Sequence, residues 1–279
     1  NIFFGPRFGG FYLALYILGN LGHTLYAQVF AVYFCDLFGG NQVFVAAVML
    51  VFFYFINLFG VDIMAKFQNA MSMILLVALA WFTVRGLPKV NWSTFFGGEG
   101  WMLNGFDGLF RASTLLTYSL LGATSLMPYS AEAKNPTRDI PLAAALSTIV
   151  IAVMFSLMAI VCAGILPLDQ VVDQSLSIIS RHFLSTPEYV FFIAGGALCA
   201  AATTLNGLIG SVTKPLVMMS HDGWLPRTLG TLHPKYKTPY KYQIIYFFIT
   251  MAPLLLGLNI KQVTNMTLLG SYLQTTLFI

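Results

Sequence analysis

Apolar residues fill most of the chain in blocks of about 20 residues, and short polar turns separate these blocks. A block of about 20 residues crosses the hydrocarbon of a bilayer as an α-helix, whereas a membrane β-strand needs only about ten residues of alternating character. The pattern therefore predicts an all-α fold, a polytopic transmembrane helix bundle. Its expected helices are residues 8–38, 43–60, 67–84, 110–130, 141–166, 189–219, 244–258 and 263–279.

The block at 110–130 differs from the others, because Gly122 and Pro128 interrupt it and a charged segment, 131–139, follows it. Backbone groups freed inside a membrane are tolerated only where protein or a water-filled cavity surrounds them. Secondary transporters place their substrates at such discontinuous helices. The pattern indicates a substrate site at Gly122, where a missing side chain exposes the backbone. A glycine that packs against a neighbouring helix is the alternative.

Composition supports a membrane protein, with 58% hydrophobic residues, 9% charged residues and a mean hydropathy of +0.78. A water-soluble globule has too much surface for so few polar residues. The net charge of +4 comes without a basic cluster among exposed aromatics, so we expect no nucleic-acid partner. The apolar blocks contain no paired acid and base and no metal spacing, so we expect no enzyme.

Lysine and arginine fall unevenly on the two sides of the predicted helices, and the richer side is expected to be cytoplasmic. That side holds nine of them: Arg7, Lys66, Lys134, Arg138, Lys214, Arg227, Lys235, Lys237 and Lys241. The other side holds five: Arg85, Lys89, Arg111, Arg181 and Lys261. The chain starts without methionine and stops inside an apolar block, so we expect residues 1–279 to be a single membrane domain, incomplete at both ends.

Three groups of residues form motifs. Residues 134–141 (KNPTRDIP) begin twelve positions after Gly122, residues 56–61 (INLFGV) precede 65–69 (AKFQN), and residues 221–226 (HDGWLP) precede 233–239 (HPKYKTP). In their residues and in their order along the chain, these motifs resemble those of the amino acid-polyamine-organocation (APC) superfamily of permeases. The resemblance implies an inverted-repeat fold of five plus five helices, of which this chain would hold family helices three to ten.

The same resemblance implies the function. It is secondary active transport of amino acids or related small organic amines by alternating access, in the lipid bilayer of the cell membrane. A cation-chloride-type ion cotransporter of the same architecture and a sensor that binds without transporting are the alternatives. The sequence does not define the oligomeric state.

The resemblance implies a substrate pocket formed by Asn20, Tyr118, Gly122, Ala123 and Thr124. Tyr118 lies one helical turn before Gly122, on the same side, where the family often has an aromatic gate, and packing in the core or against lipid is its alternative role. Thr124 stands where many members have a glutamate, so a proton carrier is not expected there. Asn20 matches an asparagine of family helix three, and an interhelical hydrogen bond is its alternative role.

Thr203 and Thr204 resemble a hydroxyl pair that binds sodium in transporters of this architecture, and hard cations prefer such oxygen ligands. Hydroxyls that bond back to their own helix are the alternative. Some members carry a lysine on family helix five in place of sodium, and none occurs around Ile74. Asn206 is a weaker candidate ligand. Sodium is the only cofactor that the sequence suggests.

Overall fold

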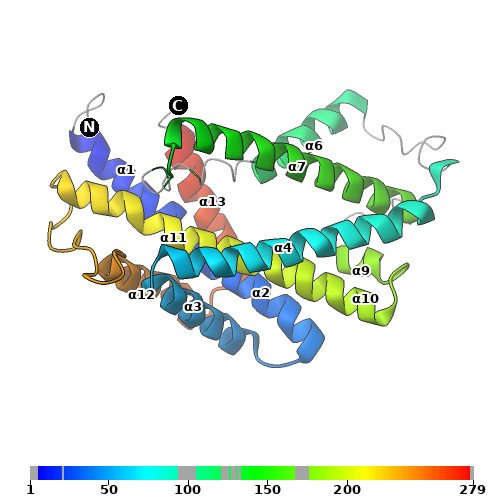
Figure 1. Ribbon diagram of the computed structural model, residues 1–279, viewed down its shortest axis with the longest axis horizontal. Coiled ribbons are helices and arrows are strands. Elements are labelled where there is room, and N and C mark those ends of the chain that lie inside the picture. The colour runs from blue at the N-terminus through cyan, green and yellow to red at the C-terminus, as the bar shows by residue number, and fades with distance from the viewer. Residues whose placement is uncertain are drawn as a thin grey trace. The chain divides into compact units, whose positions relative to one another are not determined.

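A computed structural model describes residues 6–20, 22–93, 105–120, 126, 130, 133–166 and 176–276 of the chain. Within these residues every regular element is a helix, which confirms the all-α fold class (Figure 1). The elements are α1 (Pro6–Gly19), α2 (Gly22–Phe38), α3 (Gln42–Leu58), α4 (Val61–Gly86), η1 (Leu87–Lys89), α6 (Gly105–Leu120), α7 (Pro136–Ile165), α9 (Leu176–Ser180), α10 (Thr186–Phe191), η4 (Phe192–Leu198), α11 (Cys199–His221), α12 (Tyr240–Leu255) and α13 (Ile260–Thr276).

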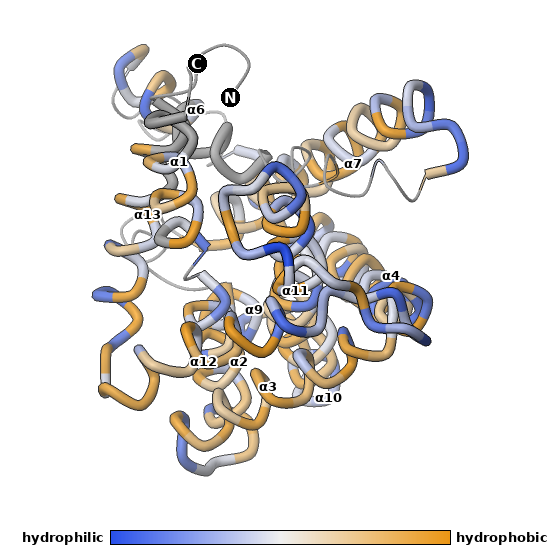
Figure 2. The backbone as a smooth tube through the Cα atoms, turned by 90° about the vertical axis from the view of Figure 1, so that its left-hand side faces the viewer, coloured by the Kyte–Doolittle hydropathy of each residue, from blue (hydrophilic) through white to orange (hydrophobic). Residues whose placement is uncertain are grey.

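Three segments of the described chain are long and apolar enough to cross a bilayer: Val61–Lys89, Pro136–Ile165 and Thr186–His221. The shorter helix Gln42–Leu58 is also apolar. Figure 2 shows the same distribution, with apolar colour along the helices and polar colour concentrated at their ends and in the connections. A bilayer selects this pattern because only the ends of a spanning helix meet water.

The first expected span, 8–38, contains two helices, since α1 ends at Gly19 and α2 begins at Gly22. Asn20 forms a turn between them. Its side-chain Nδ2 donates to the carbonyl oxygen of Tyr16 at 2.7 Å, and its backbone N–H reaches the same oxygen at 3.2 Å. A short amide side chain that bonds to the backbone competes with the regular helix, and the two glycines weaken that helix further.

The helix expected from Pro141 begins five residues earlier, at Pro136. Asn135 has a non-helical φ of −130° and occupies the cap position, and Pro136 follows in the first turn, where its missing N–H leaves no donor unpaired. The Asp139 carboxylate accepts a hydrogen bond from the backbone N–H of Asn135 at 3.2 Å. Residues 136–141 are therefore the first turns of α7 instead of a connection before it, and Pro141 lies inside the helix.

The chain folds into two compact units, which α4 and η4 connect. Unit 1 comprises residues 1–73 and 197–279, and unit 2 comprises residues 74–196. In unit 1, α2 packs against α3, α11 packs against both of them, and α13 packs against α1 and α2. Ala27, Ala31 and Ala46 are fully buried in this core. Their small side chains allow the helix backbones to approach one another closely.

The core of unit 1 also contains a set of paired polar side chains. Tyr54 on α3 lies between His23 on α2 and Thr250 on α12, with its hydroxyl 3.1 Å from the His23 Nδ1 atom and 3.2 Å from the Thr250 hydroxyl. Thr24 donates to the carbonyl oxygen of Thr250. His23 and Thr250 are fully buried and therefore lose their hydrogen bonds to water. The bonds described here replace them.

In unit 2, the helices approach each other closely at two contacts between a glycine and a valine. Gly86 at the end of α4 faces Val161 on α7, and a Cβ atom on that glycine would lie 2.3 Å from a Val161 methyl carbon. Gly164 on α7 faces Val90, and a Cβ atom there would lie 2.5 Å from a Val90 methyl carbon. A separate ion pair joins the Arg85 guanidinium to the Glu188 carboxylate at 2.9 Å.

This packing predicts the effect of adding one methyl group to unit 2. Gly86 has an ordinary helical φ of −82°, so alanine fits the backbone there, but its Cβ overlaps Val161. We expect Gly86→Ala to destabilise the folded protein by about 1–3 kcal/mol, seen as a lower melting temperature in detergent. The double variant Gly86→Ala/Val161→Ala removes the overlap and should recover most of the loss.

Gly207 on α11 supplies the control, because a Cβ atom there meets nothing within 4 Å. Gly207→Ala should leave the melting temperature unchanged or raise it. Equal melting temperatures for the wild type and Gly86→Ala would contradict the close packing of α4 on α7.

Candidate functional site

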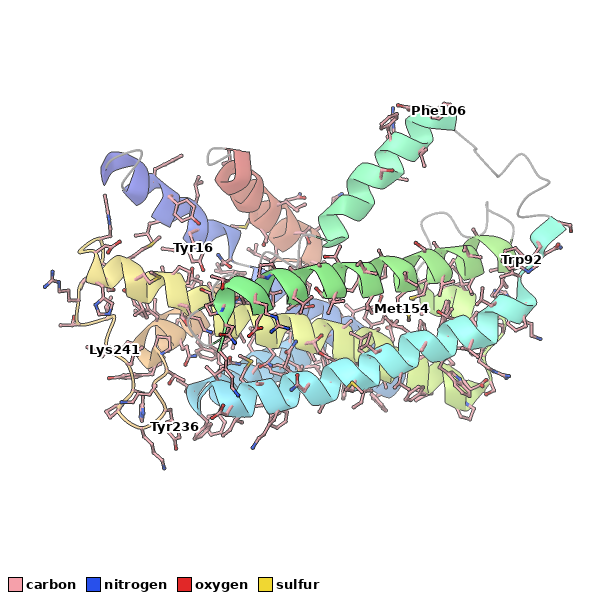
Figure 3. The ribbon with its side chains drawn as sticks, turned by 45° about the horizontal axis from the view of Figure 1, so that its top comes forward. Tyr16, Trp92, Phe106, Met154, Tyr236 and Lys241 are labelled. Carbon is pink, nitrogen blue, oxygen red and sulfur yellow. The ribbon has the colours of Figure 1, made fainter. Side chains whose placement is uncertain are left out.

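Asn20 lies in unit 1, at the turn between α1 and α2. Its amide nitrogen is used in the bond to Tyr16, whose own hydroxyl donates to the carbonyl oxygen of Val212 on α11 at 2.9 Å. Tyr16 therefore connects the turn to α11, and Figure 3 shows it on α1. The Asn20 Oδ1 atom makes no hydrogen bond within the described residues, so it is an acceptor that a ligand can use.

Tyr118 lies in unit 2, in the last turn of α6 as the structure describes that helix. Gly122, Ala123 and Thr124, the centre of the predicted pocket, lie outside the described residues. The start of α6 carries an exposed ion pair between Asp107 and Arg111, with 2.9 Å between the charged atoms. The predicted pocket residues that the structure describes are thus Asn20 in unit 1 and, for its backbone, Tyr118 in unit 2.

Thr203 and Thr204 are adjacent on α11 in unit 1, and Thr203 is only 8% exposed. Both hydroxyls donate to the carbonyl oxygen of Ala200, at 3.0 Å and 2.9 Å. A hydroxyl that donates to its own helix keeps its oxygen lone pairs as acceptors. This geometry is compatible with both readings of the pair, as helix-bound hydroxyls and as ligands of a cation.

Asn206, one turn or less further along α11, uses both its side-chain nitrogen and its side-chain oxygen in hydrogen bonds within the protein. Its Nδ2 donates to the Gln68 Oε1 atom at 2.9 Å and to the carbonyl oxygen of Met64 at 3.3 Å, both on α4. Its Oδ1 accepts from the Nδ2 atom of Asn57 on α3 at 2.9 Å. We call Asn57, Gln68 and Asn206 the amide cluster. Asn206 is fully buried and already paired, so it is a poor candidate for a sodium ligand.

Sequence reasoning missed the amide cluster, although two of the three residues stand in the motifs. Asn57 belongs to INLFGV and Gln68 to AKFQN. Gln243 on α12 extends the cluster, since its Nε2 donates to the carbonyl oxygen of Asn57 at 3.3 Å. An asparagine inside a strongly apolar run was the available signal, because an unpaired amide is costly in hydrocarbon.

Two of the motifs also meet in space within unit 1. The Thr238 hydroxyl, from HPKYKTP, donates to the carbonyl oxygen of Leu58, from INLFGV, at 3.0 Å. The Phe59 and Tyr236 rings meet edge to face with 5.4 Å between centroids. Gly60 has a φ of +106°, which suits glycine, and a Cβ atom added there would lie 3.4 Å from the Tyr236 carbonyl oxygen. Figure 3 shows Tyr236 and Lys241 together at this end of α12.

Among the described residues, no three histidine, cysteine, aspartate or glutamate side chains come together as a metal site.

Comparison with known proteins gives a match to the amino acid permease family over residues 1–279. The branched-chain amino acid permease BcaP of Bacillus subtilis (strain 168) is 28% identical over 202 residues, which cover 70% of this chain and 41% of that protein. The vacuolar cationic amino acid transporter 4 of Arabidopsis thaliana is 22% identical over 235 residues, 83% of this chain and 39% of that protein.

Human cationic amino acid transporter 4 is 25% identical over 221 residues, which cover 78% of this chain and 34% of that protein. The chain spans about two fifths of the length of the first relatives described here. The family match extends over the whole chain, and apolar helices of membrane-spanning length accompany it. The protein is an integral membrane protein, and it belongs to the amino acid permease family of the APC superfamily.

Proposed function

We propose that this chain is part of a secondary transporter that moves amino acids, or related small organic amines, across the cell membrane. The observation that carries the proposal is the family match over all 279 residues. The relatives' names agree with it, since they refer to branched-chain and to cationic amino acids. All of these relatives are named as transporters or permeases, which supports a protein that does not act as an enzyme.

The substrate class follows from what those named substrates share. Branched-chain and cationic amino acids differ in their side chains but have the same ammonium and carboxylate groups. A relative from Bacillus subtilis (strain 168), 24% identical over 199 residues, is named for methylthioribose, a molecule without these groups. We take the amino acid as the substrate class because three of these four relatives are named for amino acids, and we leave its side chain open.

The proposed mechanism is alternating access in an inverted-repeat fold, with this chain holding family helices three to ten. Rigid groups of helices would rock about a central site, which opens to one side of the membrane at a time. The division of the chain into two compact units is compatible with such a motion.

The proposed pocket comprises Asn20, Tyr118, Gly122, Ala123 and Thr124. The backbone groups around Gly122 would receive the charged ends of the amino acid. Asn20 supports this proposal by its geometry, because its Nδ2 is held by Tyr16 and its Oδ1 can accept a hydrogen bond from an ammonium group.

The proposed coupling ion is sodium, bound by Thr203 and Thr204. Their hydroxyl hydrogens point to the Ala200 carbonyl oxygen, so each can present only lone pairs to a ligand. Such a pair accepts a cation and gives nothing to an anion.

Substitution of Gly122 tests the pocket. A leucine there would fill the space beside the backbone groups, so we expect Gly122→Leu to lower uptake to the level of empty liposomes. The measurement is uptake of labelled leucine and lysine by proteoliposomes that contain the intact permease. Ala112→Leu, at an exposed position of α6, should transport normally. A fully active Gly122→Leu variant would remove the pocket from this position.

The threonine pair generates a second test, which separates sodium coupling from transport itself. Thr203→Val keeps the side-chain shape and removes one oxygen ligand, so the half-saturating sodium concentration should rise roughly tenfold. Thr264→Val is the matched control, because the Thr264 hydroxyl also bonds back to its own helix, to Ile260 at 2.7 Å. Sodium-independent uptake by the wild type would refute the sodium site and leave the amino acid proposal intact.

A further inference from the structure

A cavity of about 470 Å³ lies within unit 1, where the turn between α2 and α3 meets the turn between α12 and α13. We call it the Lys261 cavity. Its wall combines amide and ammonium groups with aliphatic side chains. The residues that line it include Gln28, Val32, Gln42, Leu254, Asn259 and Lys261.

The Lys261 cavity carries one positive charge that no carboxylate neutralises. Its lining contains no aspartate or glutamate. The ion pairs found among the described residues join Arg85 to Glu188 and Arg111 to Asp107, and neither pair involves Lys261. Helices α3 and α13 begin at the cavity while α2 and α12 end there, so the helix dipoles oppose one another and the Lys261 ammonium sets the sign of the charge. The cavity therefore favours an anionic group.

The polar wall is held in place before any ligand arrives. The Gln28 Nε2 atom donates to the carbonyl oxygen of Leu258 at 2.7 Å. Asn259 and Gln262 cap the start of α13 reciprocally, each accepting from the backbone N–H of the other at 3.0 Å and 2.9 Å. A wall fixed in this way loses little conformational entropy on binding. The flexible donors that remain are the Gln42 amide and the Lys261 ammonium.

Large apolar side chains flank the Lys261 cavity and are strongly exposed. Leu255, the last residue of α12, and Leu256, which caps it, are each 75% exposed, and Phe44 on α3 is 67% exposed. In a membrane such side chains face the acyl chains of lipids. The site thus joins an anion-binding interior to an apolar exterior, which is the polarity of an amphiphile.

We propose that the Lys261 cavity binds the anionic headgroup of a membrane phospholipid. The headgroup phosphate pairs with the Lys261 ammonium and the Gln42 amide, and the acyl chains run along Leu255 and Leu256. A lysine near the membrane surface attracts anionic lipid headgroups, and Lys261 lies on the side of the predicted helices that holds fewer lysines and arginines. A free amino acid would have to place its ammonium group against neutral oxygens such as the buried Gln28 Oε1 atom, which has no hydrogen-bond partner within the described residues.

The test measures the thermal stability of the detergent-purified intact permease with added phosphatidylglycerol or phosphatidylcholine, and counts retained lipids by native mass spectrometry. We expect phosphatidylglycerol to raise the melting temperature more than phosphatidylcholine does. Lys261→Gln should weaken the apparent affinity for phosphatidylglycerol roughly five-fold, because a lysine near anionic lipid contributes about that factor. Lys261→Arg should keep the affinity.

Two further variants separate the cavity from general surface charge. Lys89→Gln removes an exposed lysine of η1, outside unit 1, and should leave the lipid preference unchanged. Val32→Phe keeps every charge but fills part of the cavity, and should lower the affinity as Lys261→Gln does.

Three results would overturn the proposal: equal effects of the two lipids on the wild type, an unchanged preference in both Lys261→Gln and Val32→Phe, or an equal effect of glycerol phosphate without acyl chains. The last result would assign the cavity to a water-soluble anion instead of a lipid. The readouts do not involve uptake, so they are independent of the transport function proposed above.

Discussion

The fold of unit 1 depends on the pairing of buried amides in an apolar environment. Asn57 and Asn206 are 3% and 0% exposed, and no water in a bilayer core replaces a partner that is missing. Each amide of the amide cluster finds a partner on another helix, which joins α3 to α11 and α11 to α4. Apolar packing tolerates small sliding of helices, but a directional amide bond does not. The amide cluster therefore fixes the register of these three helices.

The same face of α3 carries a second polar contact one turn away. Tyr54 is three residues before Asn57, and its hydroxyl meets His23 and Thr250 from α2 and α12. The carbonyl oxygen of Leu58, at the end of α3, receives the Thr238 hydroxyl from the connection before α12. One side of α3 thus organises unit 1 along its length. A pairing lost at either level leaves a buried polar group unsatisfied, which is costly in hydrocarbon.

Hydropathy predicted the helical class because the length of an apolar block is a local property of the sequence. It did not predict the break at Asn20, where a side-chain bond to Tyr16 competes with the helix, or the start of α7 at Pro136, where Asn135 and Asp139 form the cap. The amide cluster was hidden for a different reason. Asn206 pairs with Gln68 and Asn57, which precede it in the sequence by 138 and 149 positions. Only the packed structure therefore shows that each amide has its partner.

The motifs show the limit of reading positions one at a time. INLFGV and HPKYKTP are nearly 180 residues apart, yet Thr238 bonds to Leu58 and Tyr236 packs on Phe59. The two motifs therefore pack against each other and form one contact between them. The remaining polar groups of unit 1 then divide by sign. The threonines of α11 present oxygen lone pairs, while Lys261 presents N–H donors. A cation at the proposed threonine site and an anion in the proposed Lys261 site would therefore occupy separate places in unit 1, and neither would need the amides of the amide cluster, which are already paired.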